Sequence, residues 1–132
     1  MAMDATFVFA GGGTGGHLFP GIAVAEELLR RDPHTRIIFA GSERSLEREI
    51  VDREGYAHAS LPSMPSSSWK RNPFLFAWNN WSAYRAARAL LKKEKPNAVI
   101  GLGGFASVPV VIAARRLKIP IVLLEQNVVP GR

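Results

Sequence analysis

The sequence contains no cysteine in 132 residues. Without thiols it can form neither a disulfide framework nor a thiolate metal site, which is typical of a cytoplasmic protein. No uninterrupted run approaches the roughly 20 apolar residues that a membrane-spanning helix needs. Only about four residues precede the first apolar segment, so no signal peptide is visible. We therefore expect a soluble chain that is at most peripheral to a membrane.

Acidic residues are scarce relative to basic ones. Asp and Glu total 11 against 17 Lys and Arg, which gives a formal net charge of +6. Such an excess predicts an anionic partner: nucleic acid, a membrane surface or a phosphorylated ligand. Because no recognised nucleic-acid-binding module accompanies the charge, nucleic acid is the weakest of the three and we expect no such partner.

Strand-like and helix-like segments alternate along the chain. Strands are predicted at 6–10, 35–41, 56–62, 97–105 and 120–127, and helices at 19–31, 42–55, 74–93 and 107–118. This alternation predicts an α/β fold with a doubly wound parallel sheet and helices on both faces. An α/β sheet usually continues beyond such a fifth strand, so we expect the chain to be part of a longer protein.

Two glycine-rich turns, "GGGTGGH" (11–17) and "GLGGFAS" (101–107), follow the first and fourth strands. If the strand order is 3-2-1-4-5, these strands are neighbours at the point where the order reverses, and ligands bind there beyond the carboxyl ends of the strands. Backbone N–H groups at helix N-termini favour an anion. The pattern therefore predicts a phosphate or diphosphate site, although each turn alone also fits a tight strand-to-helix connection.

A dinucleotide site is a weaker alternative. Gly11, Gly13 and Gly16 have the spacing of the dinucleotide fingerprint, but that motif also needs an acidic residue closing the second strand. Here the second strand closes with "AGS", and only Glu43 is nearby. A P-loop is excluded, because histidine and leucine follow the last glycine where lysine and serine or threonine are required.

Two side chains are candidate general bases. The positive end of a helix disfavours imidazolium, so His17 would stay neutral and could accept a proton from a hydroxyl beside a bound diphosphate. The histidine could equally cap the helix or hydrogen-bond the substrate. Glu125, in the polar end "EQN" of the fifth strand, could instead be the base, or could orient a sugar hydroxyl.

The long helix at 74–93 is predicted to have two faces. One face is mostly apolar and suits packing on the sheet: Phe76, Ala83, Ala87, Leu90 and Leu91. The other combines aromatic and basic residues, with two more basic residues just before the helix: Phe74, Trp78, Trp81, Arg85, Arg88, Lys92, Lys70 and Arg71. Exposed aromatics ringed by cations are typical of a monotopic protein on an anionic bilayer. A second apolar cluster or a protein partner would explain the aromatics equally well.

These segments resemble the MurG family. "GGGTGGHLFPGIAVAEEL" is similar to the family's first glycine loop and helix, and "GLGGFASVPVVIAARRLKIPIVLLEQN" to its second glycine loop and the segment beyond. The family moves N-acetylglucosamine from UDP-N-acetylglucosamine to lipid I, the undecaprenyl-diphosphate-linked muramoyl-pentapeptide, and forms lipid II for peptidoglycan. It works at the cytoplasmic face of the plasma membrane, with no metal and no cofactor.

The resemblance implies a fold and a set of roles. Residues 1–132 would be the Rossmann-like N-terminal acceptor domain of a GT-B glycosyltransferase, inactive without the C-terminal donor domain. His17 would be the base for the acceptor 4-hydroxyl. The donor would be reached by Thr14, Gly15, Gly16 and Asn127. The acceptor diphosphate would be held by Gly12, Gly13, Gly103, Gly104 and Ser107.

Three features depart from the family pattern. Leu124 stands where the family usually has histidine, and Val108 replaces a glycine, which would tighten or close part of the second loop. The loop "PSSSWKRNP" (65–73) also differs from the family's glycine-and-arginine segment. Two other functions stay open: a non-catalytic membrane-anchoring subunit of a split glycosyltransferase, and a dinucleotide-binding oxidoreductase domain.

Overall fold

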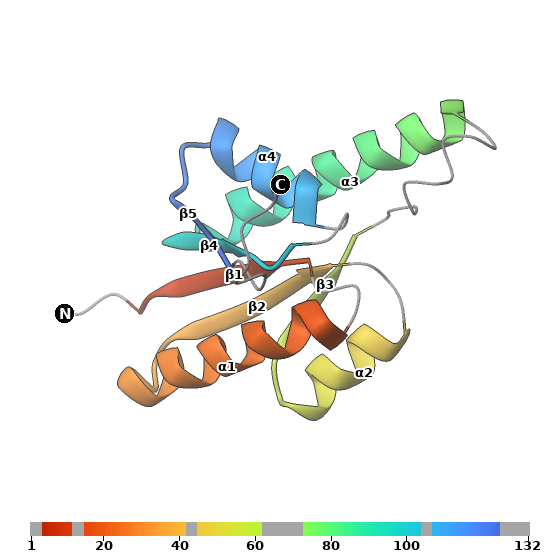
Figure 1. Ribbon diagram of the computed structural model, residues 1–132. Helices are drawn as coiled ribbons and strands as arrows, with labels where there is room; N and C mark the ends of the chain where they lie inside the picture. The colour runs from red at the N-terminus through yellow and green to blue at the C-terminus, as the bar shows by residue number, and fades with distance from the viewer. Residues whose placement is uncertain (1–3, 12–14, 42–44, 62–72, 104–106, 125–132) are drawn as a thin grey trace, which may run out of the picture.

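A parallel five-stranded sheet forms the centre of the protein (Figure 1). The computed structural model describes residues 4–11, 15–41, 45–61, 73–103 and 107–124, with the side chains of 15–17, 45–47 and 75–79 outside that description. In chain order the elements are β1 (Thr6–Ala10), α1 (Gly15–Arg31), β2 (Arg36–Gly41), α2 (Ser45–Arg53), β3 (Ala57–Ser60), α3 (Pro73–Glu94), β4 (Ala98–Gly101), α4 (Val108–Arg116) and β5 (Ile121–Leu123).

The strands lie in the order β3-β2-β1-β4-β5, and every pair is parallel. The predicted fold class and strand order are therefore confirmed. In the register, Ala10 at the end of β1 lies beside Ala40 of β2 and Gly101 of β4. Both glycine-rich turns consequently leave the sheet at its carboxyl edge, from neighbouring strands.

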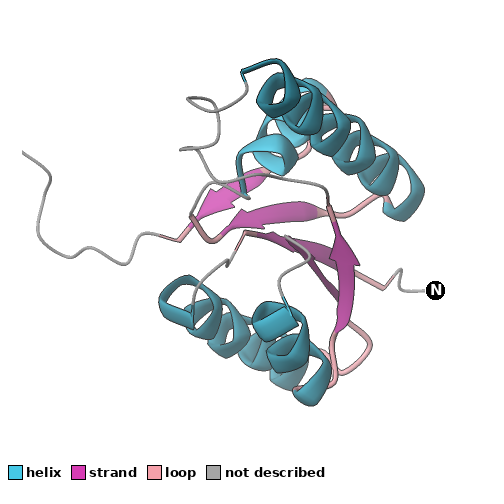
Figure 2. Ribbon diagram, turned by 90° about the vertical axis from the view of Figure 1, so that its right-hand side faces the viewer, coloured by secondary structure: helices cyan, strands magenta, loops and turns pink. Residues whose placement is uncertain are grey.

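Helices cover both faces of the sheet, α1 and α2 on one and α3 and α4 on the other (Figure 2). Because successive residues of a strand point to opposite faces, β1 contributes to both cores. Phe9 packs with Leu18 and Phe39 on the α1 side, whereas Val8 and Ala10 pack with residues of α3 and α4. The Phe9 and Phe39 rings stack with centroids 5.0 Å apart.

The α1 helix begins earlier than the sequence predicts, at Gly15 instead of Phe19. Pro20 therefore lies inside the helix. Proline has no amide hydrogen, so the carbonyl of Gly16 receives no helical bond from position 20. Apolar spacing alone misplaced the start, because it cannot register the glycine-rich first turn.

Glycine at position 21 lets α1 approach the segment that follows β4. A Cβ there would lie 2.8 Å from both Cδ atoms of Leu102, which is fully buried. The close approach holds the first half of α1 against the beginning of the second glycine-rich turn.

Candidate functional site

Sheet hydrogen bonding continues one residue past β1 and β4. The amide of Gly11 donates to the Ala40 carbonyl at 3.0 Å, and the amide of Leu102 donates to the Ala10 carbonyl at 2.8 Å. The starts of the two glycine-rich turns are therefore fixed by the backbone of the sheet, independently of any ligand.

The two turns touch each other. Gly11 adopts φ +106° and Gly103 φ +92°, both in the left-handed region that favours glycine. A Cβ on Gly11 would overlap the carbonyl oxygen of Gly103 and would lie 2.9 Å from Cβ of Ser107. The glycine at position 11 is thus required twice, by its dihedral angle and by the backbone that lies against it. The predicted convergence of the two turns is confirmed at these residues.

The N-termini of α1 and α4 flank this contact. Neither helix has an acidic residue in its first turn, so no carboxylate of its own neutralises the positive helix end there. Ser107, at the N-cap position of α4, is buried and makes no side-chain capping hydrogen bond. Two helix ends and a glycine-lined backbone therefore meet at the edge where ligands of doubly wound sheets bind.

The predicted site residues divide into two groups. Gly103 and Ser107 lie at the contact, and Gly15, Gly16 and His17 are the first three residues of α1. The others lie outside the described residues: Gly12, Gly13, Thr14, Gly104, Glu125 and Asn127. Leu124, the last described residue, donates its amide to the Gly101 carbonyl at 2.9 Å. Leu124 is therefore held beside the base of the second turn.

The α3 helix has the two faces that its sequence predicts. Ala83, Ala87 and Leu91 are buried, and Ala87 and Leu91 belong to the core that includes Val8 of β1. On the outer face the Phe74 side chain is 88% exposed and that of Trp81 is 53% exposed. Arg85 and Arg88 are also exposed. The side chains of Phe76 and Trp78 lie outside the description, as do Lys70 and Arg71. Among the described helices, none is both long and apolar enough to cross a bilayer.

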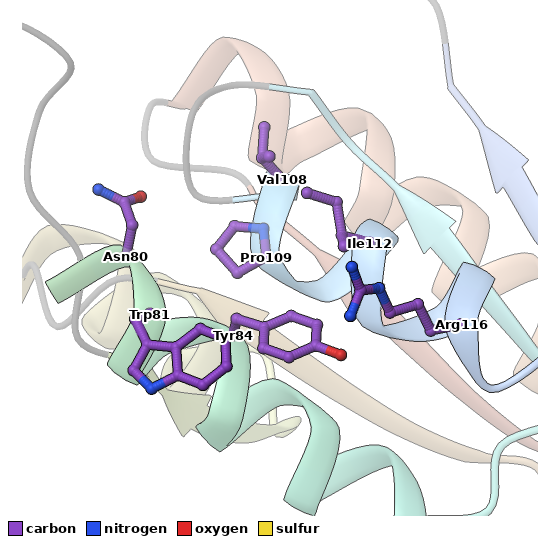
Figure 3. A pocket seen from close by; sticks show the side chains of 7 residues that line it. All are labelled: Asn80, Trp81, Tyr84, Val108, Pro109, Ile112 and Arg116. Atoms are coloured by element: carbon purple, nitrogen blue, oxygen red, sulfur yellow. The ribbon is translucent and has the colours of Figure 1, made fainter. Parts of the chain in front are cut away.

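An open groove between α3 and α4 was not predicted from the sequence (Figure 3). Its volume is about 330 Å³, and it is lined by Asn80, Trp81, Tyr84, Val108, Pro109, Ile112 and Arg116. The Trp81 and Tyr84 rings stack at 5.6 Å, and the Arg116 guanidinium lies 5.5 Å from the Tyr84 ring centroid. The available signal was the pair Val108 and Ile112, which is spaced by one helical turn and stays about half exposed on α4.

No metal centre is evident in the part of the chain that the structure describes: no three His, Asp or Glu side chains gather there to hold an ion. The helix N-termini and exposed backbone at the described edge suit anion binding, and a histidine lies in the first turn of α1.

Sequence comparison identifies the family. The sequence matches the Glycosyltransferase family 28 N-terminal domain over residues 7–132. The chain belongs to this family. The match covers almost all of the described fold, including both glycine-rich turns.

Relatives of this glycosyltransferase domain are longer proteins. The chain is 43% identical over 129 residues to the UDP-N-acetylglucosamine–N-acetylmuramyl-(pentapeptide) pyrophosphoryl-undecaprenol N-acetylglucosamine transferase of Trichlorobacter lovleyi. This match covers 94% of this chain and 33% of the relative. The transferase of the same name from Geotalea uraniireducens is also 43% identical, over 128 residues, with 94% and 34% covered. The chain thus spans about a third of the length of these relatives.

Solved structures agree with this assignment. The crystal structure of Acinetobacter baumannii MurG aligns with a TM-score of 0.76 at 27% identity, covering 97% of this chain and 36% of that one. The calicheamicin glycosyltransferase CalG4 aligns with a TM-score of 0.68 at 20% identity, covering 98% and 32%. The second likeness shows a shared fold. Together these matches identify the fold as the N-terminal half of a GT-B glycosyltransferase.

Two of the family-pattern departures can be placed in this glycosyltransferase domain. Leu124 is half-buried and packs on the α1-side core that contains Phe9 and Leu18. The apolar residue is therefore accommodated by packing. Val108 is the first residue of α4, and it is one of the residues that line the groove between α3 and α4 (Figure 3). Compared with the glycine of the family pattern, the valine side chain therefore adds volume to the lining of that groove. The third departure, residues 65–73, lies almost entirely outside the described residues.

Proposed function

We propose that this chain is the acceptor-binding and membrane-facing half of an N-acetylglucosaminyltransferase that converts lipid I into lipid II. The donor would be UDP-N-acetylglucosamine, and the place of action the cytoplasmic face of the plasma membrane. The observation that carries the proposal is the contact of Gly11 with Gly103 and Ser107 between two helix N-termini. The family match and the names of the relatives support the choice of substrates.

A diphosphate suits the carboxyl edge for electrostatic and steric reasons. Two adjacent phosphates carry more charge than one helix end can offset, and here the N-termini of α1 and α4 lie close to one backbone contact. Glycines leave space for phosphate oxygens to approach the backbone amides. We assign the acceptor diphosphate to Gly12, Gly13, Gly103, Gly104 and Ser107.

The proposed reaction is a displacement at the anomeric carbon of N-acetylglucosamine. The acceptor 4-hydroxyl oxygen forms the new glycosidic bond, the bond from the anomeric carbon to the diphosphate oxygen breaks, and UDP leaves with that electron pair. His17, in the first turn of α1, takes the hydroxyl proton, with Glu125 as the alternative base. Thr14, Gly15, Gly16 and Asn127 would reach the donor, whose main site belongs to the C-terminal domain of the family.

Membrane contact follows from the same proposal, because a lipid-linked acceptor has to be met at the bilayer surface. The exposed aromatics Phe74 and Trp81 lie on the same helix as the cations Arg85 and Arg88. Aromatic side chains that enter the interface beside cations that meet anionic headgroups are the usual features of a peripheral membrane surface.

The proposal is tested by an NMR titration of the chain with a soluble, short-chain lipid I analogue, with UDP-N-acetylglucosamine and NADH as parallel ligands. We expect the acceptor analogue to shift the amides of residues 11–17 and 101–107, and the donor to have a weaker effect. Shifts produced by NADH and not by the acceptor analogue would replace the transferase proposal with the dinucleotide-binding alternative.

A further inference from the structure

We propose that the groove between α3 and α4 holds the first isoprenoid units of the polyprenyl chain attached to the acceptor diphosphate. This inference rests on the proposed function and names a second subsite for the same substrate. Its occupant is a single lipid chain bound to protein, as distinct from the bilayer as a whole.

The shape and lining of the groove suit a slender apolar chain. Trp81, Tyr84 and Pro109 are among its lining residues, and Val108 and Ile112 stay 45% and 44% exposed at its α4 side. Its volume of about 330 Å³ is at the lower end of the roughly 300–1,000 Å³ that small-molecule sites occupy. Polar side chains lie at its edges, Asn80 on α3 and Arg116 on α4.

The groove begins next to the proposed diphosphate site. Val108 lines the groove, and the residue before it, Ser107, lies against Gly11 at the contact between the glycine-rich turns. At the start of α4 the proposed anion site is therefore followed directly by the apolar groove. A ligand in which a diphosphate is joined directly to an apolar chain matches this arrangement. A free anion or a free hydrocarbon would use only one of the two.

Positive charge at the other end of the groove is complementary to the negative charge of an anionic bilayer. A second hollow, lined by Arg85, Arg88 and Leu117, shares Trp81, Tyr84 and Arg116 with the groove. These arginines can meet the phosphates of an anionic bilayer where the lipid chain passes from the membrane onto the protein. By contrast, Phe74 is 88% exposed on α3 and suits direct insertion into a bilayer better than the half-covered Ile112 does.

The test is calorimetric titration of the chain with inorganic diphosphate, geranyl diphosphate and farnesyl diphosphate. A fully buried methylene strengthens binding roughly fourfold. Because the groove is open on one side, we expect geranyl diphosphate to bind at least about tenfold more tightly than inorganic diphosphate. Ile112→Asn should remove most of this gain and leave the affinity for inorganic diphosphate unchanged. Val108→Asn, on the same side of the groove, is the second variant.

Val122→Asn is the matched control, because Val122 is 50% exposed on β5 and does not line the groove. A prenyl gain that survives both groove variants would overturn the inference and leave the proposed function standing. The inference would also be overturned if the groove variants bound phosphatidylglycerol vesicles less well than wild type but kept the full affinity gain of geranyl diphosphate over inorganic diphosphate. That result would make the groove a contact with the bilayer. Failure of inorganic diphosphate to bind, with a prenyl gain that Ile112→Asn removes, would instead contradict the glycine-turn site alone. If none of the three ligands binds, both proposals fail.

Discussion

Gly11 lies directly against the carbonyl of Gly103, although the two residues belong to turns at opposite ends of the described chain. Each turn follows a strand, and β1 and β4 are neighbours in the sheet. The contact therefore follows from the strand order, and it brings the N-termini of α1 and α4 to the same edge. One backbone contact thus links the fold to the anion site that we propose.

The first prediction concerns this contact. Gly11→Ala forces a side chain into a φ of +106° and into overlap with the Gly103 carbonyl. We expect a loss of about 2–5 kcal/mol in the free energy of unfolding, since left-handed strain costs about 1–2 kcal/mol and overpacking about 1–3 kcal/mol more. Urea unfolding at 25 °C measures the loss, and diphosphate affinity should fall with it.

Gly55→Ala is the matched control for Gly11→Ala. Gly55 has φ +85°, but no heavy atom lies within 4 Å of the position its Cβ would take. Only the backbone strain remains, so we expect a loss of about 1–2 kcal/mol. Equal losses in the two variants would contradict the steric account of the Gly11 contact.

The sequence predicted the fold well because its signals were local and repeated. Alternating apolar segments determined the element types, and the glycine-rich turns after the first and fourth strands indicated the switch point, which the structure confirms. The start of α1 was misplaced because Gly15 and Gly16 are poor helix formers by propensity. The groove between α3 and α4 was missed because Val108 and Ile112 on α4 indicate only one of its walls, and the other wall comes from Trp81 and Tyr84 on a different helix.

The site could be predicted only in part. Convergence of Gly11, Gly103 and Ser107 follows from topology, so the sequence was sufficient for it. The roles of His17 and Glu125 depend on side-chain direction and on a bound substrate, and neither follows from strand order. These roles therefore stay predictions.

The second prediction separates a base from a helix cap at His17. In ¹H–¹⁵N spectra of the imidazole groups, an acceptor analogue with its 4-hydroxyl intact should shift the His17 ring nitrogens, because a base must lie within hydrogen-bond reach of the proton it removes. The 4-deoxy analogue should leave them unshifted while still moving the amide of Gly103. The other two histidines, His34 and His58, serve as internal references. Equal shifts of His17 with both analogues would contradict the proposed role.

The third prediction concerns stability at high pH. Partial burial, together with the nearby charges of Glu26 and Glu54, raises the pKa of Tyr56 above its ordinary value of 10.0. A raised folded-state pKa contributes stability that is complete below pH 10 and is lost as the pH rises through the folded pKa. Tyr56→Phe keeps the packing on Phe39 but removes the ionisation. Urea unfolding between pH 8 and 11 should therefore show wild type losing stability relative to this variant only above about pH 10. If the difference in unfolding free energy between wild type and Tyr56→Phe stayed constant from pH 8 to 11, the raised pKa of Tyr56 would be contradicted.

The last prediction tests the outer face of α3 as a membrane surface. Sedimentation with phosphatidylglycerol vesicles measures the partition coefficient. Each of Arg85→Gln and Arg88→Gln should lower it about fivefold, because a cation near an anionic surface contributes about 1 kcal/mol. These losses should shrink as salt is added, because screening weakens the attraction. Phe74→Ser should lower partitioning at all salt concentrations, since the loss of apolar insertion is not screened.

Two substitutions on the opposite layer of the sheet serve as controls for that experiment. Arg48→Gln removes one exposed cation from α2, and Phe19→Ser removes a 51% exposed aromatic from α1. Both change net charge or apolar surface as the α3 variants do, but on the far side of the molecule (Figure 2). If the outer face of α3 is the membrane surface, neither control should reduce partitioning appreciably. If Arg48→Gln lowers it as much as Arg85→Gln, the net charge of +6 drives binding without a defined surface, because a uniform field depends on total charge and not on position.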